Sequence, residues 1–133
     1  MESKHAVMTY FYISGVFDPE EITQLLGLEP TDYWSVGDIN DEAYWAFGEN
    51  DKYDPYVFNM VKQSIAPLLD KKDILKEIHD KYQVRMFIEI VATMDKEEVL
   101  PCFSPDLDII DFCHETRTEI DYDLYIDNEV VEE

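Results

Sequence analysis

The sequence predicts a single α+β domain, a ferredoxin-like two-layer sandwich with helices on one face of an antiparallel or mixed sheet. The first observation behind this prediction is size. The chain has 133 residues, of which 46% are hydrophobic and 14% aromatic, enough for one core. The second is the order of the predicted elements, in which two strand–helix–strand halves follow each other. The third is the pair of similar helix starts, FDPEEI and FSPDLD. We therefore expect one domain over residues 1–133.

The first half is predicted to begin with a strand and a capped helix. Residues 6–14 (AVMTYFYIS) are rich in aromatic and β-branched side chains, which favour a strand near the sheet centre. Asp18 is a suitable N-cap, Pro19 suits the first helical position and Gly27 is typical of a C-terminal cap. We expect a helix between Asp18 and Gly27.

A tryptophan-containing hairpin and two helices are predicted next. Residues 33–36 and 43–47 favour short strands on either side of a polar turn that begins at Gly37. Apolar residues recur at helical spacing over 56–69 and over 71–82, which predicts two helices. The first of them should end or kink at its internal proline.

The second half repeats the strand and the capped helix. Residues 84–94 (VRMFIEIVATM) favour a buried strand. Ser104 is the expected N-cap of the following helix, with Leu107, Ile110 and Cys113 pointing inward.

The final predicted strand, residues 118–126 (TEIDYDLYI), alternates between two kinds of side chain. One face contains Ile120, Tyr122, Leu124 and Ile126, and the other contains Glu119, Asp121, Asp123 and Tyr125. Residues 127–133 are expected to form a frayed acidic tail.

Negative charge dominates the chain and is unevenly distributed. The formal net charge is -21, from 31 acidic and 10 basic residues. Seven of the ten basic residues lie between residues 62 and 96, whereas residues 106–133 contain eleven acids and one arginine. Such a surface attracts a basic partner and repels phosphate groups. We therefore expect a basic protein partner, and neither nucleic acid nor a membrane surface.

The expected location is the cytoplasm. The N-terminal segment MESKHAV lacks the apolar stretch of a signal peptide, and nothing approaches the roughly 18 apolar residues of a membrane helix. The two cysteines are too few for a disulfide framework, and we expect both to be reduced and buried.

The sequence lacks the motifs of common catalytic and cofactor sites. Its four glycines do not have the spacing of a phosphate-binding loop, and its cysteines and histidines are too scattered for zinc. Cys113 and His114 are neighbours on a predicted helix and point about 100° apart, so they do not form a catalytic pair. Residues 38–49 have the length of a calcium-binding loop, but Ala43 stands where that loop requires glycine, which leaves adventitious binding of a divalent cation as the alternative at this acidic cluster. We predict no enzyme activity, no catalytic residue, no cofactor and no metal.

An acidic and aromatic segment, residues 33–56, is the main candidate for a binding surface. In one interpretation Trp34 and Trp45 are core residues and the acids form a solvated rim. In the other, aromatic rings supply contact area and carboxylates pair with a partner's Lys and Arg. The acidic last strand either extends this surface or prevents aggregation at the sheet edge. The candidate partner-binding residues are Asp38, Asp41, Glu42, Tyr44, Glu49, Asp51, Asp54, Asp121, Asp123 and Tyr125.

Three segments of the chain resemble a bacterial family of domains of unknown function, number 4279. They are YFYISGVFDPEEITQLLGLEPTDYWSVGD, the later YWAF and the closing IDYDLY. The residues that carry the resemblance are Asp18, Pro19, Gly27, Pro30, Trp34, Gly37, Asp38, Trp45, Asp121 and Tyr122. The resemblance covers nearly the whole chain and implies a compact bacterial α+β domain, but it implies no activity.

Two classes of function fit these observations. The first is an acidic protein-binding domain, such as an immunity protein or inhibitor that neutralises a basic toxin, for example a nuclease. A mimic of nucleic acid is a variant of this class. The second is a small-ligand-binding or enzymatic domain with a pocket where Trp34 and Trp45 converge. A regulatory interaction domain of unknown partner is the remaining alternative.

Overall fold

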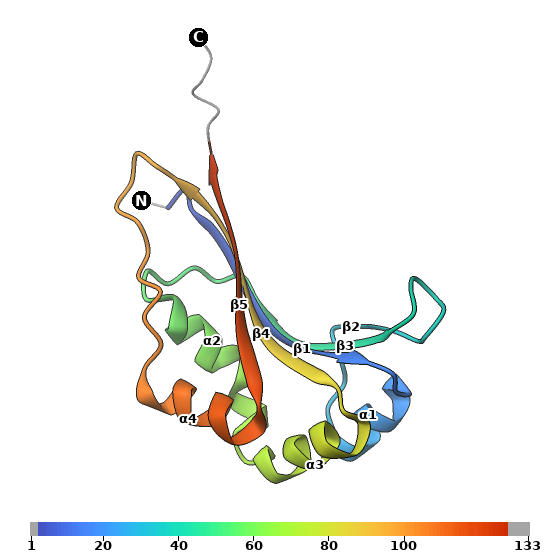
Figure 1. The fold of residues 1–133 in the computed structure, drawn as a ribbon. Coiled ribbons are helices and arrows are strands. Elements are labelled where there is room, and N and C mark those ends of the chain that lie inside the picture. Colours follow the sequence, from blue (N-terminus) through green and yellow to red (C-terminus); the bar gives the residue numbers. More distant parts are fainter. Residues whose placement is uncertain (1–2, 128–133) are drawn as a thin grey trace.

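A computed structural model describes residues 3–127, which form a five-stranded sheet and four α-helices (Figure 1). In chain order the elements are β1 (Ala6–Gly15), α1 (Pro19–Leu26), β2 (Asp32–Trp34), β3 (Ala43–Asn50), α2 (Val57–Ile65), the 3₁₀ turn η1 (Ala66–Leu68), α3 (Lys72–Tyr82), β4 (Arg85–Asp95), α4 (Leu107–Thr116) and β5 (Thr118–Asp127). The predicted α+β class is confirmed, and the helices lie on one face of the sheet (Figure 1).

The sheet is mixed, with the strand order β2-β3-β1-β4-β5. Strand β1 is central, as predicted, and pairs antiparallel with both β3 and β4. Strands β4 and β5 are parallel, and α4 lies in the crossover that a parallel pair requires. Strands β2 and β5 therefore form the two edges of the sheet.

The core lies between the sheet and the helices. Alternate residues of β1 and β4, such as Phe11, Ile13 and Ile88, are fully buried on the helix side. Trp45 of β3 is also fully buried, and its Nε1–H donates to Thr23 Oγ1 of α1 at 3.0 Å. The core thus joins the central strands to the helical layer.

Helix α2 approaches the sheet closely because β3 has a glycine at the contact. Gly48 has φ +80°, and a Cβ placed on it would lie 2.2 Å from the carbonyl oxygen of Ser64. Beside this contact, the buried hydroxyl groups of Ser64 and Thr9 are 2.8 Å apart and share a hydrogen bond. A larger residue in β3 would separate α2 from the sheet.

The predicted caps of α1 are confirmed. The Asp18 carboxylate accepts a hydrogen bond from the Glu20 N–H at 3.0 Å, and Pro19 is the first helical residue. Gly27 ends the helix in the left-handed conformation, with φ 67°. The proline of the predicted 56–69 helix lies in η1, where α2 ends.

The start and the inward face of α4 differ from the prediction. Asp106, not Ser104, is the N-cap, because its carboxylate accepts the Ile109 N–H at 3.2 Å. The side chains that face the sheet are then those of Ile109, Phe112 and Thr116. Leu107 and Ile110, which were expected to point inward, are 74% and 45% exposed. Packing against the sheet therefore buries a different side of α4 from the one that the spacing of its apolar residues predicted.

Three smaller expectations concern the ends of the chain and its cysteines. Asp127 is the last residue of β5, and the rest of the predicted acidic tail, 128–133, lies outside the described residues. Both cysteines are free, but Cys102 is exposed, so the prediction of two buried thiols is wrong. Within residues 3–127, no helix has the length and apolar character needed to cross a membrane.

Candidate functional site

The face of the sheet opposite the helices, here called the open face, collects aromatic and acidic side chains. It consists of the strand positions that alternate with the core positions. From these strands it receives Met8, Tyr10, Tyr12, Tyr44, Arg85, Phe87, Glu89, Val91, Glu119, Asp121, Asp123 and Tyr125. No helix of the described residues covers this face.

Aromatic rings form a strip across the open face. Trp34 of β2 stacks on Tyr44 of β3, with ring centroids 4.2 Å apart. Tyr44 contacts Tyr12 of β1 at 5.3 Å, and Tyr12 stacks on Phe87 of β4 at 4.8 Å. The Arg85 guanidinium lies over the Phe87 ring at 4.8 Å. Four neighbouring strands thus contribute to one preformed, half-buried aromatic surface, which we call the aromatic strip.

A shallow hollow of about 240 Å³ lies beside the aromatic strip. Its polar lining includes Tyr10, Asp32, Tyr44 and Glu49. Apolar side chains, including Val91, complete the wall. A ligand in this hollow would meet aromatic surface and two carboxylates.

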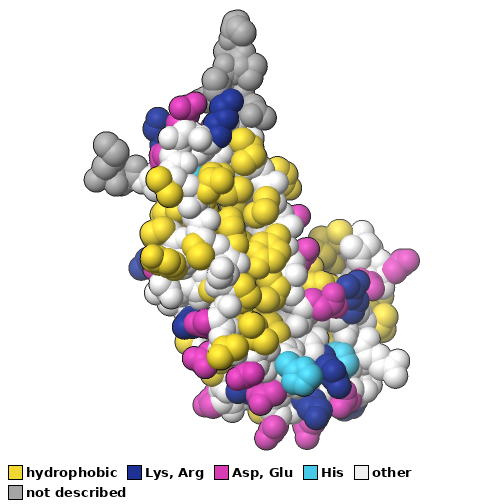
Figure 2. Space-filling model, turned by 60° about the vertical axis from the view of Figure 1, so that its left-hand side comes forward, with side chains coloured by type: hydrophobic (Ala, Val, Ile, Leu, Met, Phe, Trp, Pro, Cys, Tyr) yellow, Lys and Arg dark blue, Asp and Glu magenta, His cyan; other side chains and the backbone are white. Residues whose placement is uncertain are grey.

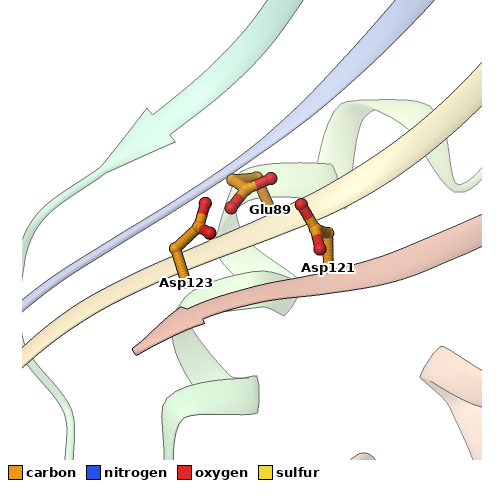
Figure 3. A group of neighbouring side chains, drawn as sticks. All are labelled: Glu89, Asp121 and Asp123. Atoms are coloured by element: carbon orange, nitrogen blue, oxygen red, sulfur yellow. The ribbon is translucent and has the colours of Figure 1, made fainter. Parts of the chain in front are cut away.

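Three carboxylates meet where β4 and β5 pair, and we call them the carboxylate triad (Figure 3). Glu89 stands opposite Asp121 in the parallel register, and Val91 stands opposite Asp123. Each of the three acids can place one carboxylate oxygen within 4.8 Å of the others. Glu89 is only 3% exposed, and its Oε2 has no hydrogen-bond partner among the described residues.

Burial and neighbouring charge shift the pKa values on the open face. Burial raises the pKa of Glu89 to about 9, with further contributions from Asp123 and Asp121. Burial also raises the pKa of Tyr12 to about 12, and Glu89 adds to this shift. The pKa of Tyr44 is raised mainly by burial. The open face therefore disfavours additional negative charge.

The charge of the sheet is strongly one-sided. Arg85 is the only Lys or Arg in the five described strands. It forms an ion pair with Glu119 at 3.0 Å, so one acid already neutralises it. The strands also contribute Asp32, Glu49, Glu89, Asp121 and Asp123 to the open face or to its hollow. A cation that approaches the open face meets a region of strong negative potential.

The structure brings together half of the predicted partner-binding residues. Those on the open face or in its hollow are Tyr44, Glu49, Asp121, Asp123 and Tyr125. Asp38, Asp41 and Glu42 lie in the loop between β2 and β3, and Asp51 and Asp54 follow the opposite end of β3. The predicted acidic and aromatic segment is therefore divided between the two ends of one strand.

Two of the acids outside the open face organise local turns. Asp38 Oδ2 accepts the Ser35 N–H at 2.9 Å, beside Gly37 with φ 93°. Asp54 Oδ1 accepts the Tyr56 N–H at 2.8 Å just before α2. These contacts explain the positions of both acids by local folding.

The two tryptophans lie on opposite faces of the sheet. Trp34 is half-buried on the open face, where it stacks on Tyr44, and its Nε1–H donates to the Glu42 carbonyl at 3.1 Å. Trp45 is in the core against α1. They do not line a common pocket, so the predicted pocket between them is wrong. Trp34 pairs with Tyr44, and the side chain of the next residue, Trp45, points to the other face of the sheet.

Several open-face residues were not among the predicted site residues. The sequence pattern of Tyr10, Tyr12 and Phe87 predicts only that they belong to strands, and Glu89 is a single acid between buried apolar neighbours. An isolated acid inside a buried strand is the one signal in the sequence that points to this site. Its partners, Asp121 and Asp123, are found only once β4 and β5 are paired.

A band of exposed apolar side chains adjoins the open face along the β5 edge (Figure 2). Tyr122, Leu124 and Ile126 project from β5 on the helix side, as the alternation predicted. Leu107 and Ile110 of α4 are exposed near the start of the helix. Helix α4 ends at Thr116, and on this part of β5 only Ile120 packs against the core. The outer half of β5 thus has an acidic face and an uncovered apolar face.

These features define an α+β domain with one helical layer and one open, acidic and aromatic sheet face. The chain belongs to the family described as Domain of unknown function (DUF4279), which it matches over residues 5–127. This match confirms the resemblance noted in the sequence. Comparison with curated proteins gave no match, and neither did comparison with solved structures.

Proposed function

We propose that the domain binds a basic protein partner on its open face. The observation that carries this proposal is the aromatic strip in a sheet whose five strands contain a single basic residue, Arg85. Aromatic rings supply contact area at low entropic cost, and surrounding acids steer a basic protein into contact. In the specific form of this proposal, the domain is a bacterial cytoplasmic inhibitor, such as an immunity protein, that neutralises a basic toxin.

Strand β5 extends the proposed interface beyond the open face. Its Asp121 and Asp123 point to the open face, while Leu124 and Ile126 expose apolar surface on the other side. The outer edge of β5 pairs with no other described strand. A partner that covers this edge contacts acids and apolar side chains together, which combines electrostatic steering with burial of hydrophobic surface.

The experiment is a comparative pull-down from a bacterial lysate with three tagged full-length baits. The first is the wild type, and the second reverses two open-face charges with D32K and E49K. The third is a matched control that reverses two exposed acids on the helices, E20K and E77K. Retained proteins are eluted at about 0.5 M salt, which screens exposed charges, and identified by mass spectrometry.

The expected result is a basic protein that wild type and control retain at low salt and release at high salt. The D32K/E49K bait should lose it, with an association rate at least about 10-fold lower in a follow-up binding measurement. Equal loss from the control bait would show that net charge alone matters. Retention by the D32K/E49K bait would contradict the assignment of the open face.

A second candidate function is binding of a small cationic ligand in the hollow beside the aromatic strip. Its carboxylates, Asp32 and Glu49, and the rings of Tyr10 and Tyr44 favour an ammonium group. A polyamine panel that raises the melting temperature of the wild type but not of D32K/E49K would support it.

We also retain the ferredoxin-like sandwich as a proposed fold class, supported by the single helical layer (Figure 1).

A further inference from the structure

The carboxylate triad is built by sheet pairing, and it does not depend on a flexible acidic loop. Glu89 comes from β4, and Asp121 and Asp123 come from β5, at positions that the ten-residue parallel register fixes. In Figure 3 the Glu89 carboxylate lies between those of Asp121 and Asp123. Three hard oxygen ligands are therefore held at one place on a rigid part of the fold.

Glu89 is the unusual member of the triad. Only 3% of the residue is exposed, and its Oε2 is buried without a hydrogen-bond partner in the described chain. A buried polar atom without a partner costs free energy, so native proteins nearly always provide one. The two side chains that share the cluster with it, Asp121 and Asp123, are themselves acids. The triad therefore contains no positively charged group.

No basic side chain of the described residues fills this role. The nearest base on the open face, Arg85, is paired with Glu119. None of the ion pairs in residues 3–127 includes Glu89, Asp121 or Asp123. We propose that the carboxylate triad binds a divalent cation, Ca²⁺ in particular, which supplies the missing positive charge.

The kind and number of the ligands favour Ca²⁺ over Mg²⁺. Mg²⁺ demands near-ideal octahedral geometry, keeps several of its waters and is usually held by one or two carboxylates, whereas Ca²⁺ accepts more protein oxygens in flexible geometry. The triad supplies three carboxylates that each have an oxygen within 4.8 Å of the others. Asp121 and Asp123 are open to solvent, where water completes the coordination. With only three protein ligands, a Kd of about 0.1–1 mM is expected.

The test measures Ca²⁺ binding by the full chain, after removal of metals with EDTA and dialysis. Calorimetric titrations use CaCl₂ and, separately, MgCl₂ in buffer with about 0.15 M NaCl. The variants are E89Q, which keeps the shape of the side chain, and the double variant D121N/D123N. The matched control is E20Q/E77Q, which removes the same number of charges from exposed positions on the helices. The Ca²⁺-induced rise in melting temperature is the second readout, and circular dichroism checks folding.

The proposal is supported if the wild type and the control bind Ca²⁺ with Kd values within about 2-fold of each other. The Kd values of E89Q and of D121N/D123N should be at least about 10-fold higher. Wild type and control should also melt at higher temperature with Ca²⁺, whereas E89Q should not. Absence of binding by the wild type up to about 10 mM Ca²⁺ would overturn the proposal, because this concentration lies well above the expected Kd. Equal binding by wild type and E89Q, or equal weakening by the control, would also overturn it. Tighter Mg²⁺ binding would overturn the choice of Ca²⁺.

Discussion

Replacing Glu89 by Gln should stabilise the metal-free protein, and the gain should grow with pH. The pKa of Glu89 is raised to about 9 in the folded chain, against an ordinary value of 4.5. Below about pH 4.5 the Glu89 carboxyl is protonated in both the folded and the unfolded state, so folding requires no change in its protonation and the stabilising contribution of the protonated carboxyl is fully present. As pH rises toward 9, the unfolded state loses the proton first, and this contribution is progressively lost. Gln keeps the neutral side chain at every pH.

The size of the effect follows from the pKa difference. Each pH unit between the two pKa values changes the free energy of unfolding by about 1.4 kcal/mol for one proton. Between the ordinary pKa of 4.5 and pH 7 this gives an upper limit of about 3.4 kcal/mol. Water reaches Asp121 and Asp123, and it screens their effect on Glu89. We therefore expect E89Q to be about 1–2 kcal/mol more stable than the wild type at pH 7.

The assay is urea unfolding of wild type and E89Q in EDTA at several pH values between about 4.5 and 9. The difference between their free energies of unfolding should be near zero at the lowest pH and should increase steadily above it. E49Q, which removes one exposed carboxylate from the hollow, controls for the loss of a charge. A difference that stays constant across the range would refute the claim that Glu89 is held protonated by burial.

Three further predictions concern stability and reactivity. G48A should lower the free energy of unfolding in urea by at least about 3 kcal/mol, because its Cβ would overlap a backbone oxygen of α2. G37A, at φ 93° but in open space, should cost about 1 kcal/mol, and a cost equal to that of G48A would contradict this argument. D106A removes the N-cap of α4 and should cost about 1 kcal/mol by the same assay. At pH 8 a thiol reagent should modify the exposed Cys102 well before Cys113, because burial raises the pKa of the Cys113 thiol to about 11. Equal rates of modification, measured by mass spectrometry, would contradict this prediction.

The local signals of the sequence were sufficient for most elements. Asp18, Pro19 and Gly27 form the caps of α1 because capping depends on residues within one turn of the helix end. The central position of β1 followed from its aromatic and β-branched content. The start of α4 differs from the prediction because Ser104 and Asp106 both suit an N-cap, and the helix begins after Asp106, where Ile109 and Phe112 pack against the core.

The candidate site was harder to predict because it depends on strand pairing. Asp121 and Asp123 were recognised as acids of an edge strand, but Glu89 became their neighbour only through the parallel register of β4 and β5. Trp34 and Trp45 are close in sequence, yet they lie on opposite faces of the sheet. Trp34 pairs with Tyr44, and Trp45 is the next residue of β3, whose successive side chains point to opposite faces. Nothing within a local window of sequence specifies such long-range neighbours.

The composition of the open face differs from that of an ordinary solvent-facing sheet surface. A sheet with one solvated face usually places polar, exposed side chains there. Here Tyr12, Tyr44 and Phe87 are half-buried on one another, and Glu89 is buried with an unpartnered oxygen. The aromatic rings leave apolar surface in contact with water, and the buried acid lowers stability at neutral pH. Residues that disagree with the local rules of stability are expected where a protein binds something. The open face collects such residues from three strands, whereas the helix side of the same strands is a regular hydrophobic core.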